Sequence, residues 1–175
     1  MPLKLIIAEP RADKGDLWRE EFADVPTVEV VEAPPSELQS IAEVDAELLP
    51  SLVACMRYGV AASDASEVLD TGDEPDAPSW VVTTPNIPVQ ESYEVGDDGK
   101  LVRVRTRTIG DEQLVYGLFR QVFSAISRLN ATGGTKIDTL GFGAESVCYR
   151  CDLASHTAAI KRAYLEYLSE GSCQV

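Results

Sequence analysis

Short apolar runs alternate with segments of helical periodicity along this chain, and that alternation constrains the fold more than any other feature of the sequence. The first run, Leu3–Ala8, is continuous, which is typical of a strand covered on both faces. Further strands are predicted at Thr27–Val31, Asp45–Val53 and Ser79–Pro85, and in a last run that begins at Lys136. Strands that alternate with helices predict a three-layer α/β/α sandwich with a mixed, largely parallel central sheet.

Two long helices are expected in the second half of the chain. The clearer one begins at Asp111, and its core face consists of Leu114, Leu118, Val122, Ile126 and Leu129. The other is capped by Asp152 and ended by Gly171. Its core face consists of Ile160, Ala163, Tyr164, Tyr167 and Leu168.

The first half is expected to hold shorter helices. One covers Asp16–Phe22, with an apolar stripe of Leu17, Trp18 and Phe22. Another follows an N-cap at Ser36 and ends at Ile41. Between Tyr58 and Pro78 the chain is small, polar and acidic, which predicts a long loop or lid interrupted by a strand-like stretch at 67–69.

We expect residues 1–175 to form a single domain with a β-hairpin insertion at about residues 91–108. The segment from Gly96 to Lys100 separates the two arms of this hairpin. The second arm alternates β-branched residues with Arg103, Arg105 and Arg107. The arginine row predicts a solvated face or, alternatively, a positive patch that receives an acidic partner.

Charge and composition exclude several classes of function. The 175 residues include 15 Lys and Arg against 29 Asp and Glu, a formal net charge of −14, so the bulk surface would repel nucleic acid and anionic membranes. Without a run long enough for a membrane span or a signal-peptide pattern, we expect a cytoplasmic protein whose four cysteines stay thiols. A small anionic ligand is still compatible, because a local group of N–H donors can outweigh the distant field.

A ligand site is predicted beyond the carboxyl ends of the strands, where three segments are expected to meet. The segment Gly141–Ser146 contains a Gly-x-Gly pattern, which is expected to form a loop whose N–H groups a phosphate can approach. An ordinary turn is the alternative for this segment. The loop after Val53 offers the guanidinium of Arg57, the ring of Tyr58 and a flexible Gly59, and the third segment is the turn at Thr84.

Residues near the end of the chain suggest two other kinds of site, a redox site and a metal site. Cys148 and Cys151 form a CxxC pair before the last helix, which would suit a redox protein or, with His156, a zinc site. No second CxxC exists, so two ordinary thiols are the favoured interpretation. The only histidine, His156, is expected on an exposed helical turn and not as a catalytic base. Neither a G-x-S-x-G elbow, a P-loop nor a G-x-G-x-x-G motif is present.

The order of segments resembles the macro domain family, in particular its divergent, macro-like members. Val28–Val31 followed by Asp45 and Ala46 is similar to the family's second strand and the aspartate-alanine that opens the next. Arg57–Val60 occupies the place of the glycine-rich loop that holds the distal ribose. Trp80–Pro85 lies where the family has a strand that runs into a turn with proline, and Leu140–Gly143 matches its phosphate loop.

Macro domains bind ADP-ribose, and some remove it from modified proteins. The resemblance therefore implies ADP-ribose or a related nucleotide as ligand, an ADP-ribosylated protein as partner, and no cofactor or metal. It also implies N–H donation to the diphosphate from the segment Gly141–Ala144. Residues 47–52 lack the family's asparagine, and Glu32 stands near the position of its adenine-binding aspartate, which Glu32 is expected to replace.

Three carboxylates are candidates for contact with ribose or a catalytic water: Asp45, Asp64 and Glu145. The predicted ligand-binding residues are Gly141, Phe142, Gly143, Ala144, Glu145, Ser146, Arg57, Tyr58, Gly59, Val60, Glu32 and Thr84. The enzymatic hypothesis is an ADP-ribosyl hydrolase. The first alternative is a non-catalytic protein-interaction module on a degenerate macro fold, and the second is a CxxC redox or metal protein.

Overall fold

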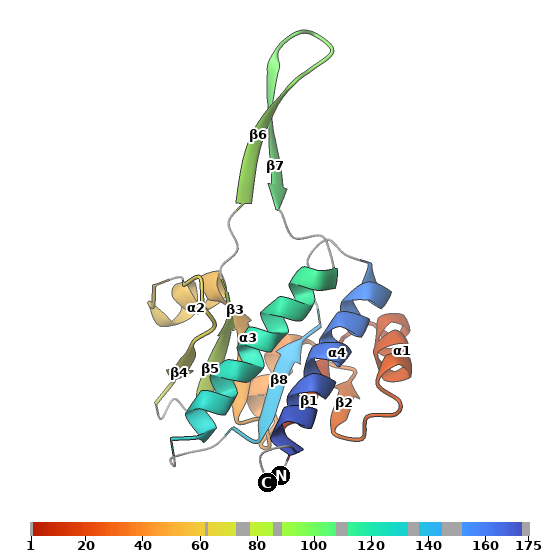
Figure 1. Ribbon diagram of the computed structural model, residues 1–175, viewed down its shortest axis with the longest axis vertical. Coiled ribbons are helices and arrows are strands. Elements are labelled where there is room, and N and C mark those ends of the chain that lie inside the picture. The colour runs from red at the N-terminus through yellow and green to blue at the C-terminus, as the bar shows by residue number, and fades with distance from the viewer. Residues whose placement is uncertain are drawn as a thin grey trace.

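The computed structural model describes residues 2–61, 63–72, 78–85, 89–107, 112–132, 137–144 and 152–172, and for 89–92, 103–107 and 171–172 it describes the backbone alone. The body is built on a six-stranded sheet in the order β2-β1-β8-β3-β5-β4 (Figure 1). All neighbouring strands are parallel except β4, which runs antiparallel to β5. The strands are β1 (Lys4–Ala8), β2 (Val28–Val31), β3 (Ala46–Pro50), β4 (Val68–Asp70), β5 (Trp80–Thr84) and β8 (Thr139–Gly143).

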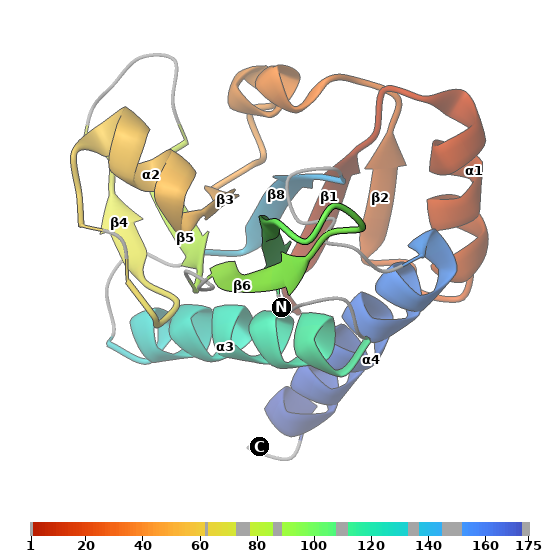
Figure 2. The same cartoon turned by 90° about the horizontal axis from the view of Figure 1, so that it is seen from above.

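Helices cover both faces of this sheet, so the predicted α/β/α architecture is confirmed. One face is covered by α1 (Ala12–Glu21), α3 (Glu112–Asn130) and α4 (Leu153–Ser172). The opposite face is covered by the 3₁₀ helix η1 (Pro35–Ser40) and by α2 (Ser51–Tyr58). Figure 2 looks along the sheet from above and shows these two layers on either side of the strands.

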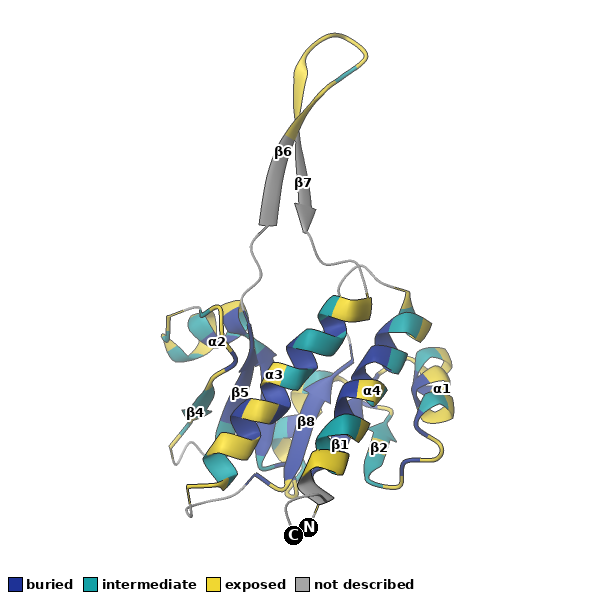
Figure 3. Cartoon of the chain, in the orientation of Figure 1, coloured by how far each residue is buried: buried dark blue, intermediate teal, exposed yellow. Residues whose placement is uncertain are grey.

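The alternation of side chains along each strand decides which layer a residue joins. In β3, Ala46 and Leu48 point toward the large core shared with α1, α3 and α4, whereas Leu49 packs with α2. In β8, Leu140 and Phe142 belong to the same large core. The inner strands β1, β8, β3 and β5 are therefore largely buried, as their dark blue colour in Figure 3 shows, whereas the edge strands β2 and β4 are only partly buried.

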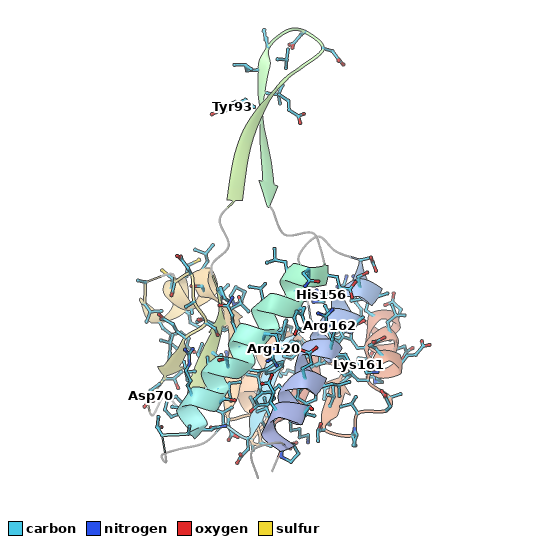
Figure 4. The ribbon with its side chains drawn as sticks, in the orientation of Figure 1. Asp70, Tyr93, Arg120, His156, Lys161 and Arg162 are labelled. Carbon is cyan, nitrogen blue, oxygen red and sulfur yellow. The ribbon has the colours of Figure 1, made fainter. Side chains whose placement is uncertain are left out.

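The last helix is fastened to the beginning of the chain. The hydroxyl of Tyr164 donates to the carbonyl of Leu3 and lies 2.6 Å from the hydroxyl of Thr27. Lys161 donates to the carbonyl of Glu21 at 2.9 Å and to a carboxylate oxygen of Asp24 at 2.9 Å. The outer surface of α4 also stacks Arg162 over the ring of Tyr116 in α3, 3.9 Å from its centroid (Figure 4). These contacts hold α4 against the start of the chain, the end of α1 and the outer side of α3.

A hairpin of β6 (Val89–Val95) and β7 (Leu101–Arg107) projects from the body and forms a separate two-stranded sheet (Figure 1). Its antiparallel register runs from Val89↔Arg107 to Val95↔Leu101. The turn is closed by a hydrogen bond from the Gly96 N–H to the Lys100 carbonyl, and Gly99 has a φ of +77°. The predicted hairpin is confirmed.

Several local predictions are wrong. Helix α2 was not foreseen: the apolar run from residue 45 to 53 divides at Pro50, which ends β3 and stands at the N-cap position of α2. Ser36 is no cap, because η1 starts after Pro34 and has no side-chain cap hydrogen bond. Leu17 is 51% exposed on the outer side of α1. Gly171 does not end α4, which continues to Ser172.

Other helix predictions are confirmed. Helix α3 ends at Asn130, whose amide oxygen accepts the Ile137 N–H at 2.9 Å. The carboxylate of Asp152 accepts the Ser155 N–H at 2.9 Å, which caps α4 and lowers the pKa of Asp152. Among the described residues, every helix is too short or too polar to cross a membrane.

Candidate functional site: a crevice between β3 and β8

The carboxyl ends of the parallel strands lie at one edge of the sheet, and helix N-termini gather there. Helices α1 and α2 begin directly after the carboxyl ends of β1 and β3. Helix α4 follows β8, and α3 precedes β8, so both also start at this edge (Figure 1). Each N-terminus carries a partial positive charge, although the N–H groups of Arg11 and Ser155 are already bonded to Glu9 and Asp152. In sheets of this kind ligands bind where the strand order reverses, which here is at β1, β8 and β3.

The ladder between β3 and β8 ends early. It contains only the pairs Ala46↔Leu140 and Glu47↔Gly141. By contrast, β8 stays paired with β1 as far as Ala8↔Gly143, and β3 stays paired with β5 as far as Pro50↔Thr84. The two strands therefore separate in their carboxyl halves, where the described ladder between them has no further pair.

Glu47 lies at the point where the two strands separate. Its side chain points away from the large core, since its neighbours Ala46 and Leu48 point into it. The residue is 4% exposed, and its Oε2 has no hydrogen-bond partner in the described part of the chain. It forms an ion pair with Arg57 of α2, whose guanidinium nitrogen is 3.8 Å from Oε2. A buried carboxylate oxygen without a hydrogen bond costs stability unless a ligand or solvent group satisfies it.

Burial raises the pKa of the Glu47 carboxyl, and the opposing effects of Arg57 and a hydrogen bond from Gln39 do not offset it. Glu9, at the carboxyl end of β1, provides a contrast. It is just as buried, but its Oε1 accepts the backbone N–H and the Nε–H of Arg11, each at 3.1 Å. The two buried glutamates therefore differ in kind: Glu9 is satisfied by its own loop, and Glu47 is not.

Thr84 is placed at this edge as predicted. It ends β5, is 1% exposed, and its hydroxyl has no partner among the described residues. The hydroxyl of its neighbour Thr83 accepts the Glu67 N–H at 2.9 Å. Ser51, the first residue of α2, accepts the Ser63 N–H at 3.0 Å. Among the described residues, Thr84 and Glu47 each have a buried polar oxygen without a hydrogen-bond partner, but Thr84 lies on the face of Val82 and Glu47 on the opposite face, that of Val81.

The predicted ribose segment lies largely on a helix. Arg57 and Tyr58 form the last turn of α2 and not a loop, and Gly59 ends that helix with a φ of +69°. Val60 packs beside Tyr58 against the small cluster under α2. Asp64 lines an open hollow of about 650 Å³, together with Val60, Ala61, Ser63, Ala65, Glu67 and Leu69. This lining carries two carboxylates and no cation, so the hollow is unsuited to a phosphate.

The Gly-x-Gly loop is wrong as a local structure. Gly141, Phe142 and Gly143 are strand residues of β8, hydrogen-bonded beside β1. Phe142 is fully buried against Trp18 and Phe119 and presents no side chain to a ligand. Ala144 follows the strand and donates its N–H to the Ala8 carbonyl at 2.9 Å, so that donor is already used. Glu145 and Ser146 lie outside the described residues.

Two other candidates lie away from the crevice. Asp45 precedes β3, at the amino edge of the sheet, and one of its carboxylate oxygens accepts the N–H groups of Asp138 and Thr139 at 2.9 and 3.0 Å. It joins two strand starts, so its role as a catalytic carboxylate is not supported by its position. Glu32 follows β2, which β1 separates from β8.

His156 corrects another expectation. It is fully buried in α4 and not on an exposed turn, with its ring edge-on to Trp18 at 6.0 Å between centroids. Neither ring nitrogen has a hydrogen-bond partner in the described part of the chain, and burial lowers its pKa to about 4. Cys148 and Cys151 lie outside the described residues. Within the described ones, no group of three or more His, Cys, Asp or Glu is placed to hold a metal ion.

Sequence reasoning missed Glu47 as a site residue. The signal was present, because a single charged residue interrupts the apolar segment Ala46–Pro50. A charge inside a strand that is covered on both faces needs a partner or a ligand.

No protein-family model matches the chain, and no curated protein matches it.

Proposed function

We propose that the chain is a macro-like domain that binds ADP-ribose or a related nucleotide in the crevice between β3 and β8. The observation that carries this proposal is the early end of the ladder at Glu47↔Gly141, at the point where the strand order reverses. Beyond that pair, β8 offers Gly143, which has no side chain to keep a ligand from its backbone.

The chemistry of the crevice suits both halves of such a ligand. A diphosphate would be attracted by the partial positive charge of the surrounding helix N-termini, which acts locally although the chain as a whole has a net charge of −14. Arg57 adds one cation to this edge. A ribose supplies hydroxyl groups, which can donate to the free oxygen of Glu47.

Removal of ADP-ribose from modified proteins is the enzymatic extension of this proposal. In that reaction the phosphate and ribose groups of the substrate would position the attacking water, and N–H donors would stabilise the charge that develops. Asp64 and Glu145 remain the carboxylate candidates for contact with the water, since Asp45 is bonded to the amino edge. The assay is release of ADP-ribose from a modified protein.

Binding is tested by calorimetric titration of ADP-ribose into the protein and into two matched variants. Glu47→Gln and Asp45→Asn both convert a carboxylate into an amide. Glu47 lies at the crevice, whereas Asp45, two residues earlier, is bonded at the amino edge of the sheet. We expect Glu47→Gln to weaken binding about tenfold, the equivalent of one lost charge-assisted hydrogen bond. Asp45→Asn should leave the affinity unchanged. No heat and no thermal shift with millimolar ADP-ribose would remove the proposal.

A second variant probes the strand itself. Gly143→Glu places a side chain and a negative charge at the mouth of the crevice, so binding of an anionic nucleotide should be lost. Thermal melting establishes that this variant is folded before its affinity is interpreted. Retained binding in folded Gly143→Glu would place the ligand elsewhere.

A second candidate function is favoured by the hairpin. A non-catalytic interaction module would use the projecting strands β6 and β7 instead of the crevice. The two candidates separate by variant: charge reversal at Arg103 and Arg105 should abolish the interaction, whereas Gly143→Glu should leave it intact.

A further inference from the structure

The hairpin is an incomplete sheet. Strands β6 and β7 pair with each other, and neither pairs with another described strand. Figure 1 shows both strands standing clear of the body. A two-stranded hairpin on its own is at best marginally stable in water, and its outer edges present free backbone donors and acceptors. The natural completion of such a sheet is a further strand.

The outer half of the hairpin also exposes large apolar side chains. Tyr93 is 63% exposed, Val95 72%, Leu101 71% and Val102 51%. Figure 4 shows Tyr93 far from the body of the protein. These residues are neighbours in the ladder, since Val95 faces Leu101 across the two strands. Their exposure at one end of the molecule is typical of a surface that meets another chain.

The hydrogen bond that closes the turn tells which backbone groups are free. The Gly96 N–H donates to Lys100, so Gly96 and Lys100 form a hydrogen-bonded pair. Such pairs recur at every second residue, which directs the backbone groups of Glu94 and Ser92 toward β7. The intervening residues of β6 therefore direct their N–H and C=O groups to the outer edge: Val89, Glu91, Tyr93 and Val95.

We propose that this outer edge of β6 pairs with β6 of a second copy of the chain. The two strands would run antiparallel about a two-fold axis through Ser92, and the two hairpins would form one four-stranded sheet. In that register Glu91 stands opposite Tyr93 of the second copy, and Val89 stands opposite Val95 of the second copy. No like charges face one another, and each apolar end residue meets another apolar residue.

The equivalent pairing about the centre of β7 is opposed by its charges. An axis through Val104 would set Arg103 opposite Arg105 of the second copy. An axis at Arg103 or at Arg105 would set each of these arginines opposite itself. Like charges directly opposite each other destabilise a sheet. Self-pairing is therefore compatible with β6 and opposed at β7, although the two strands belong to the same hairpin.

Net charge explains why two copies would meet at this place. Residues 89–107 contain four acidic and four basic residues, so the hairpin is formally neutral and the chain's net charge of −14 lies on the rest. Two such bodies repel each other, but pairing at the projecting hairpins leaves them apart (Figure 1). Added salt screens the remaining repulsion, so the dimer should tighten as the ionic strength rises.

The test is sedimentation equilibrium of the full chain and of two matched proline variants. Proline removes a backbone N–H, and at Glu91 that N–H points to the outer edge, so Glu91→Pro spares the ladder with β7. Arg105 is the register partner of Glu91, so its backbone N–H is directed to the outer edge of β7. We expect a dimer for the native chain and for Arg105→Pro, and an association weakened at least tenfold for Glu91→Pro.

A second pair of variants guards against local disruption by proline. Tyr93→Glu would set two glutamates opposite each other at each of the two symmetric positions and should yield a monomer. Tyr93→Lys would set a lysine opposite Glu91 of the second copy and should preserve the dimer.

Three results would overturn the proposal. One is a native chain that stays monomeric at every concentration and salt level, and another is a dimer that survives both Glu91→Pro and Tyr93→Glu. The third is growth beyond the dimer with rising concentration, which indicates head-to-tail pairing of β6 with β7. Glu47→Gln should leave the dimer unchanged, so this proposal stands or falls separately from nucleotide binding.

Discussion

The central sheet and the hairpin consist of the same kind of structure but are stabilised differently. The sheet joins strands from opposite ends of the chain, since β8 lies between β1 and β3, and helices bury it on both faces. The hairpin joins consecutive strands and exposes apolar residues at its outer end. Packing between segments remote in sequence therefore stabilises the body, whereas the hairpin depends on pairing between its own two strands and on any chain that binds it.

The largest predicted difference between the two regions comes from truncating an apolar side chain. Phe142 is fully buried beside Trp18 and Phe119, so Phe142→Ala should lower the free energy of unfolding by about 3–5 kcal/mol. Leu101 is 71% exposed in the hairpin, and Leu101→Ala should change the free energy of unfolding by less than about 0.5 kcal/mol. Urea unfolding measures both, and similar values for the two variants would contradict the comparison.

The next largest effect is a dependence of stability on pH, which arises in the body because His156 is buried there. The pKa of His156 is lowered by burial from 6.5 to about 4, so the unfolded chain takes up a proton first as the pH falls. The folded protein should therefore lose about 3 kcal/mol of stability between pH 6.5 and pH 4, and none of this loss should occur above pH 6.5.

His156→Leu isolates this contribution. Glu47, whose pKa is raised by burial, acts in the opposite direction, because there the folded chain takes up a proton first. That effect is common to the native chain and the variant, so it cancels in the difference between their stability curves. The variant should lose less stability than the native chain between pH 6.5 and pH 4. Parallel curves would show that His156 does not titrate differently in the two states.

The smallest effect compares glycines with different reasons for being glycine. A Cβ on Gly141 would lie 3.1 Å from Leu38 and 3.2 Å from Val44, so Gly141→Ala should cost about 1–3 kcal/mol through overpacking of η1 against the sheet. A Cβ on Gly99 meets nothing within 4 Å, but its φ of +77° makes Gly99→Ala cost about 1 kcal/mol through the backbone. Asparagine tolerates the left-handed conformation, so Gly99→Asn should be more stable than Gly99→Ala. Gly141→Asn should be no more stable than Gly141→Ala, because the added side chain still overpacks η1.

Local signals predicted the elements that depend on nearby residues. The hairpin follows from a glycine-rich turn between two β-branched arms, α3 from apolar residues at helical spacing, and the α4 cap from Asp152. Helix α2 was missed because its apolar residues continue the run of β3 without a change of pattern. Leu17 and His156 were misplaced because the side of a helix that faces the core depends on its neighbours in space.

The candidate site was predictable only in part. The sequence correctly placed Thr84 at the carboxyl edge of the sheet, since it ends a predicted strand and the carboxyl ends of parallel strands meet at one edge. It placed Gly141–Gly143 in a loop, because a glycine pair after an apolar run resembles a turn when the partner strand is unknown. Asp45 looked available for the same reason: its partners, Asp138 and Thr139, are more than half the chain away.

The sequence by itself determined the alternating strands and helices, the hairpin and the acid charge, because these are set by neighbouring residues and by composition. Only the tertiary structure decided that β8 lies between β1 and β3, that β3 leaves it after Glu47↔Gly141, and that the Oε2 atom of Glu47 is buried there without a hydrogen bond. The physical reason is that pairing and burial are relations between segments remote in sequence. A strand's own residues specify which faces it can bury, and its neighbours in space decide which of its polar groups remain open.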